Sequence, residues 1–88
     1  MSSPYRRKQV RRAILETLLM AKGYALETQH LQSCVDDMVK PALTDDEWKD
    51  SVNFLGAGEY MRRVAEDADV TLVQWAITTR GKTLLASI

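Results

Sequence analysis

Apolar residues recur at helical spacing in three successive stretches of the chain. Over residues 4–21 they are Val10, Ile14, Leu18 and Ala21, with Leu15 and Leu19 widening the apolar face. Over residues 28–39 they are Leu31, Cys34, Val35 and Met38, and over residues 45–55 they are Trp48, Val52 and Leu55. The pattern therefore predicts three amphipathic helices.

Residues with known helix-end preferences stand at the borders of these stretches. Serines precede Pro4, which suits a first helical turn, and the pair Lys22 and Gly23 predicts the first helix end. Residues 24–26 then form a short extended link, and Pro41 stops the second helix. Thr44 followed by Glu47 reads as a capping box that opens the third helix, which we expect to end at Gly56 and Gly58.

The spacing of apolar residues then changes from helical to alternating. Residues 60–65 and 70–77 predict two strands of a hairpin, with Val73, Trp75 and Ile77 on one face of the second. Residues 66–69 form a polar turn between them. Thr78 or Thr79 can cap a short last helix. The expected fold class is α+β, mostly α.

Three phrases in this order resemble the winged-helix (winged helix-turn-helix) superfamily. They are residues 44–48 (TDDEW), 52–61 (VNFLGAGEYM) and 77–85 (ITTRGKTLL), and the likeness extends from about residue 10 to residue 85. The resemblance implies one three-helix winged-helix domain over residues 1–88, with a C-terminal β-hairpin wing, a short last helix and flexible residues 1–5. Small phage and bacterial proteins of unassigned function are similar in length and layout, and DNA-binding members of the superfamily act in transcription regulation.

Charge is unevenly distributed although the chain has 12 basic and 12 acidic residues. Residues 1–12 carry five bases and no acid, residues 13–58 carry eight acids and three bases, and the last thirty residues carry four of each. The overall excess of basic residues that is usual in nucleic-acid-binding domains is absent. The asymmetry instead directs attention to local basic groups.

The N-terminal bases form the first candidate binding site. They are Arg6, Arg7, Lys8, Arg11 and Arg12. Residues four apart share a helix face, so such a face could neutralise DNA phosphates. It could equally dock an acidic protein surface or the acidic middle of a second copy, or remain a solvated helix face.

The predicted hairpin region supplies a second basic group, Arg62, Arg63, Arg80 and Lys82. The resemblance implies phosphate or minor-groove contact by wing arginines, whereas Glu66, Asp67 and Asp69 at the expected wing tip would repel DNA. Charged strand edges that prevent aggregation are the structural alternative.

The third helix is acidic for a DNA-reading helix. Asp45, Asp46, Glu47 and Asp50 stand against the single base Lys49. The first three can complement the helix dipole, but Asp50 lies further in. We therefore expect no base reading from this helix. Its acidity favours a protein-interaction module, whereas the winged-helix resemblance favours double-stranded DNA; the two rank nearly equal, with DNA slightly ahead.

No pattern of catalytic residues emerges, and we expect a binding protein without enzymatic activity, cofactor or small-molecule substrate. His30 and Cys34 are four apart, but a metal site needs more ligands, so we expect none. Trp48 and Trp75 are expected in the core. The single cysteine and the absence of a long apolar run predict a cytoplasmic protein that does not enter a membrane.

The predicted last helix is more apolar than a free chain end requires. Leu84, Leu85 and Ile88 are its apolar residues. Winged-helix regulators often pair through their first and last helices, so the resemblance implies a homodimer with contacts at these three residues.

Overall fold

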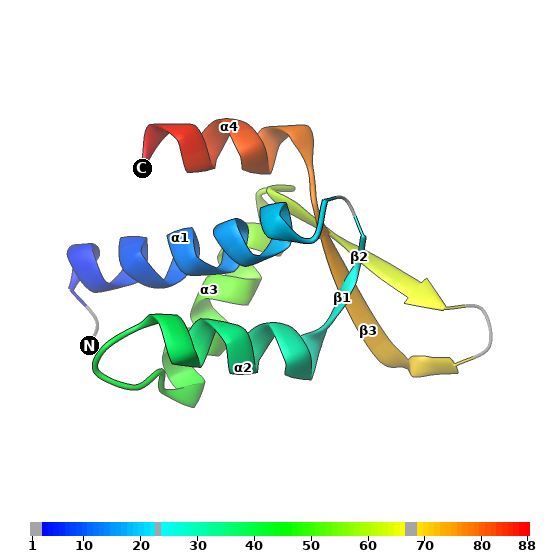
Figure 1. Ribbon diagram of the computed structural model, residues 1–88, viewed down its shortest axis with the longest axis horizontal. Coiled ribbons are helices and arrows are strands. Elements are labelled where there is room, and N and C mark those ends of the chain that lie inside the picture. Colours follow the sequence, from blue (N-terminus) through cyan, green and yellow to red (C-terminus); the bar gives the residue numbers. More distant parts are fainter. Residues whose placement is uncertain (1–2, 23, 67–68) are drawn as a thin grey trace.

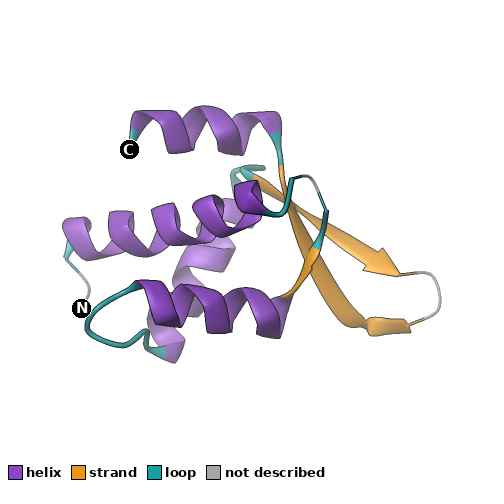
Figure 2. Cartoon of the chain, viewed as in Figure 1, coloured by secondary structure: helices purple, strands orange, loops and turns teal. Residues whose placement is uncertain are grey.

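The expected α+β, mostly helical fold class is confirmed in the described part of the chain (Figures 1 and 2). The computed structural model describes residues 3–22, 24–66 and 69–88, and side chains outside residues 65–72. The elements follow in the order α1 (Pro4–Met20), β1 (Leu26–Glu27), α2 (Thr28–Met38), α3 (Asp45–Ala57), β2 (Met61–Glu66), β3 (Asp69–Ile77) and α4 (Thr79–Ser87).

Three of the helix starts follow from side-chain caps. Ser3 Oγ accepts from the backbone N–H of Arg6 at 3.1 Å, and Pro4 opens α1. Of the residues 1–5 that were expected to be flexible, residues 1 and 2 lie outside the described part of the chain. The predicted capping box of Thr44 and Glu47 is present at the start of α3. Thr78 caps α4 by accepting from the N–H of Gly81 at 3.0 Å. Each cap satisfies a backbone donor that the helix itself cannot pair.

The first three helices end within two residues of the expected positions. Ala21 is the C-cap of α1, and Lys22 takes the left-handed backbone conformation at φ 54°; Gly23 lies outside the described residues. Helix α3 runs through Gly56 and is capped by Gly58. Gly56 does not end α3, because a single interior glycine costs a helix only about 1 kcal/mol relative to alanine. It faces the indole of Trp75, and a Cβ there would lie 3.6 Å from the ring.

Strand β3 of the hairpin also pairs with β1, a segment that was expected to be only a link. The sheet order is β1-β3-β2, and Leu26 pairs with Trp75 in the antiparallel register. Thr28 strengthens this junction, since its Oγ1 donates to the carbonyl of Val73 at 2.8 Å and accepts from Trp75 Nε1 at 3.1 Å. The pairing joins residues almost fifty positions apart, so it could not be read from local periodicity.

Helix α1 lies between α2 and α4, and α3 crosses behind it (Figure 1). The buried core draws on every helix except α4 and on the sheet; its largest buried side chains are Ile14, Leu15, Leu18, Leu31, Leu55 and Met61. Leu19 and Met38, expected on apolar faces, are 43% and 44% exposed. No helix among the described residues is both long and apolar enough to cross a bilayer.

Candidate functional site

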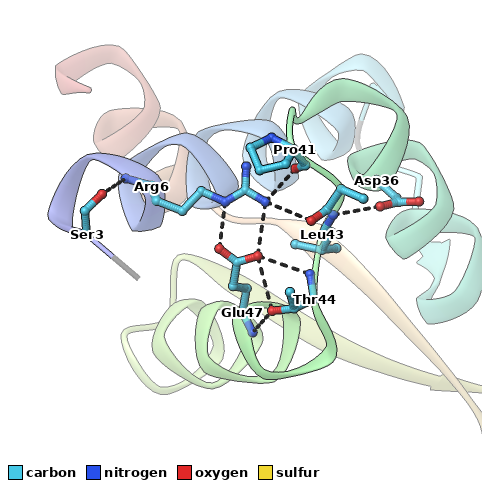
Figure 3. A network of polar contacts seen from close by, with 8 residues as sticks. Ser3, Arg6, Asp36, Pro41, Leu43, Thr44 and Glu47 are labelled. Atoms are coloured by element: carbon cyan, nitrogen blue, oxygen red, sulfur yellow. Dashed lines mark hydrogen bonds and ion pairs between the residues drawn. The ribbon is translucent and has the colours of Figure 1, made fainter. Parts of the chain in front are cut away.

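The side chain of Arg6, one of the predicted binding residues, is engaged inside the molecule (Figure 3). Its Nε lies 2.6 Å from Glu47 Oε2, and its Nη2 lies 3.0 Å from Glu47 Oε1. The same Nη2 donates to the carbonyls of Pro41 and Ala42 at 2.8 and 3.2 Å. Both charged side chains are only 12% exposed. Arg6 therefore joins α1 to α3 and to the preceding loop, and is not free for a partner.

Glu47 serves two structural elements with one carboxylate. Its Oε1 accepts from the backbone N–H of Thr44 at 3.1 Å, which completes the capping box, while both oxygens hold Arg6. The hydrogen bond to Glu47 raises the pKa of Arg6, desolvation opposes this, and the charge attraction to Glu47 reinforces it. The Arg6 guanidinium accordingly stays charged throughout the physiological pH range.

The other N-terminal bases divide into engaged and exposed residues. The guanidinium of Arg11 lies 3.6 Å over the ring of Phe54, with its Nη2 3.7 Å from Asp50. Arg12 pairs with Glu16 one turn later. Arg7 and Lys8 are exposed and make no ion pair within the described part of the chain. The predicted five-residue basic face is thus reduced to these two residues.

Most acids of α3 face the arginines of α1. Asp46, Glu47 and Asp50 line one hollow with Arg6 and Arg7. The side of α3 that faces the hairpin instead presents Asn53 and Ala57, which are neutral. The acidity of this helix is therefore concentrated on one face, and composition alone did not reveal that its hairpin side is uncharged.

A groove runs between α3 and the hairpin, and we call it the hairpin groove. One part, of about 650 Å³, is lined by Gly56, Glu59, Met61, Arg62, Arg63, Trp75, Thr78, Thr79 and Arg80. The other, of about 740 Å³, is lined by Thr28, Val52, Asn53, Gly56, Ala57, Arg63, Val73 and Trp75. Gly56, Arg63 and Trp75 line both parts, so the two adjoin at the indole ring.

The hairpin groove brings together three of the four predicted bases of this region. Arg62, Arg63 and Arg80 line it, and Glu59 is the one acid among the described lining residues. Arg80 also places its guanidinium 5.0 Å from the ring centre of Tyr60. Lys82 is exposed on α4 and does not line the groove. The result is a local positive charge in a neutral chain.

The two basic groups are linked by a row of stacked side chains, in which Arg11 lies over Phe54, Phe54 stacks on Tyr60, and Arg80 lies over Tyr60. The N-terminal end of α1 lies towards one end of the long axis and the hairpin towards the other (Figure 1). The expected acidic wing tip falls partly outside the described residues: Asp67 is not described, nor are the side chains of Glu66 and Asp69. The hairpin bases and the bases at the start of α1 nevertheless line different hollows, which share no lining residue.

The apolar residues of α4 have partners within the molecule. Leu84 and Leu85 are half-buried and pack against the core. Ile88 is also half-buried and lines, with Leu84, a second groove beside α1. Packing against the core therefore explains why Leu84 and Leu85 are apolar, without requiring the dimer that was expected from the sequence.

The remaining candidates have mostly structural positions. Trp48 is 7% exposed and belongs to the core, as expected, whereas Trp75 is only partly buried and forms the centre of the hairpin groove. Cys34 Sγ lies 3.8 Å from His30 Nε2. No third His, Cys, Asp or Glu joins them into a metal-binding group in the part of the chain that the structure describes.

Comparison with known proteins identifies no family for this chain. No protein-family model matches the sequence, and no curated protein sequence matches it significantly.

Proposed function

We propose that this chain is a winged-helix domain without enzymatic activity that binds double-stranded DNA through its backbone phosphates, in a regulatory role. The element order and the antiparallel sheet order β1-β3-β2 support the winged-helix assignment. The observation that carries the DNA proposal is the gathering of Arg62, Arg63 and Arg80 around one groove between α3 and the hairpin.

Phosphate contact is the chemistry that this groove supports best. Guanidinium groups bind phosphate oxygens bidentately and remain charged at all relevant pH values. Arg62 and Arg63 stand on a strand and Arg80 on the first turn of α4, so rigid elements hold all three. Phosphate contacts give affinity and orientation without sequence information.

Helix α3 does not oppose this mode of binding. The acids that argue against DNA lie mainly on the side facing α1, where Arg6 and Arg11 neutralise Glu47 and Asp50. The hairpin side of the helix carries Asn53, which is exposed. A duplex backbone lying in the hairpin groove would meet arginines and neutral helix, not a row of carboxylates.

Salt-dependent anisotropy with a labelled duplex of arbitrary sequence tests the proposal. The wild type should bind with a log K against log salt slope of about −2 to −3, as two or three phosphate contacts predict. Arg63→Ala and Arg80→Ala should each weaken binding and reduce the slope by about 1. Arg12→Ala, whose arginine pairs with Glu16 on another face, is the matched control and should bind like the wild type. No binding at low salt, or equal loss in the control, would refute the proposal.

A further inference from the structure

A second groove lies between the first turns of α1, the last turn of α3 and the end of α4, and we call it the α1–α4 groove. Its volume is about 300 Å³, comparable with a small ligand pocket and enough for one or two large side chains. It is lined by Pro4, Arg7, Lys8, Arg11, Phe54, Leu84 and Ile88.

The lining combines apolar surface with positive charge. Pro4, Phe54, Leu84 and Ile88 contribute the apolar part, and Phe54 is 41% exposed. Every charged residue among the described lining residues is basic. Arg7 and Lys8 are exposed, and Arg11 has a buried Nε without a hydrogen-bond partner among the described groups. The groove thus offers apolar contact beside two exposed cations, Arg7 and Lys8, that make no ion pair among the described residues, whereas Arg11 already pairs with Asp50.

We propose that the α1–α4 groove binds an acidic peptide segment of another protein. A large apolar side chain of that segment enters between Phe54, Leu84 and Ile88, and flanking carboxylates meet Arg7 and Lys8. Such a segment matches both parts of the lining, because apolar burial supplies affinity and opposite charge supplies orientation and a faster encounter. This site is distinct from the hairpin groove and does not depend on DNA binding.

Two other occupants fit the surface less well. Nucleic acid would gain little beyond phosphate contact, since Arg11 already lies over the ring of Phe54 and Tyr60 stacks against it at 5.7 Å, leaving less of that ring for a base. A second copy related by two-fold symmetry would bring both sets of Arg7 and Lys8 into one interface, where like charges repel.

The test uses the full chain and two labelled helical peptides of about 15 residues. One carries two leucines, one helical turn apart, among glutamates; the other has glutamine at every glutamate position. Binding is measured by anisotropy, and the site is located by amide chemical shifts in two-dimensional NMR. The acidic peptide should bind and shift the amides of Phe54, Leu84 and Ile88, and the glutamine peptide should bind on the order of tenfold more weakly.

Reversing the charge of the two exposed bases of the groove tests whether they contact the acidic peptide. The double variant Arg7→Glu, Lys8→Glu should lower affinity for the acidic peptide on the order of tenfold or more, because two exposed cations become anions. Lys40→Glu, an exposed reversal in the loop after α2, is the matched control and should bind like the wild type. Failure of the acidic peptide to bind at millimolar concentration, equal binding of the two peptides, or shifts confined to the hairpin would overturn the proposal. So would a wild-type dimer in analytical ultracentrifugation that Ile88→Asp converts to monomer, since the groove would then belong to a second copy.

Discussion

The guanidinium of Arg6 and the carboxylate of Glu47 face each other in a two-point ion pair that joins the first turn of α1 to the first turn of α3. The pair also fixes the loop between α2 and α3, since Arg6 donates to the carbonyls of Pro41 and Ala42. A charge that sequence analysis assigned to partner binding thus holds together elements 41 positions apart.

Arg6→Ala should therefore destabilise the domain by about 2–3 kcal/mol, because it leaves a largely buried carboxylate without its partner. Arg12→Ala, which removes an exposed pair within one helix, should cost less than about 0.5 kcal/mol. Urea unfolding followed by circular dichroism measures both. Equal losses in the two variants would show that the Arg6 pair has no special structural role.

The two helical glycines should respond in opposite ways to alanine. A Cβ on Gly81 would meet the carbonyl oxygen of Tyr60 at a clashing distance, so Gly81→Ala should cost about 2–4 kcal/mol by displacing α4 from the hairpin. A Cβ on Gly56 would lie 3.6 Å from the Trp75 ring, an ordinary contact. Gly56→Ala should then stabilise α3 by about 0.5–1 kcal/mol. Thermal and urea unfolding of both variants measure these changes in stability. An unchanged stability of Gly81→Ala would contradict the close contact between Gly81 and the Tyr60 carbonyl.

Thr28→Val should weaken the attachment of α2 to the sheet. The substitution keeps the side-chain shape but removes the donor to the Val73 carbonyl and the acceptor of the Trp75 indole N–H. We expect a loss of about 1–2 kcal/mol. Thr83→Val, which removes an exposed hydrogen bond to the carbonyl of Thr79, is the matched control and should change stability by less than about 0.5 kcal/mol.

Trp75 should report occupation of the hairpin groove. The chain has two tryptophans, of which Trp48 is buried and Trp75 lines both parts of the groove. In a Trp48→Phe variant, addition of duplex DNA should change the emission of Trp75 in parallel with the anisotropy. In a Trp75→Phe variant the buried Trp48 should show no such change. An unchanged Trp75 signal at saturating DNA would place the duplex elsewhere.

Leu85→Lys would be a poor test of self-association, although Leu85 is one of the expected dimer contacts. Leu85 packs against the core, so the substitution should destabilise the fold by about 1–3 kcal/mol whether or not the chain pairs. Ile88 lines the α1–α4 groove at the end of the last helix, and Ile88→Asp should leave the stability within about 1 kcal/mol of the wild type. Sedimentation and urea unfolding of both variants separate assembly from folding.

The local pattern of residues along the sequence determined which helices and strands this chain forms. Helical spacing, the capping box of Thr44 and Glu47, and the alternation around Trp75 act within a few residues, so they predicted the helices and the hairpin to within about two residues. Tertiary structure alone decided where the charges lie. Arg6 points inward, three acids of α3 turn towards α1, and Arg80 joins the arginines of the hairpin, because these positions depend on how distant elements pack and in what helical phase. The pairing of Leu26 with Trp75 has the same cause: a hydrogen-bonded partner nearly fifty residues away leaves no mark on the local pattern.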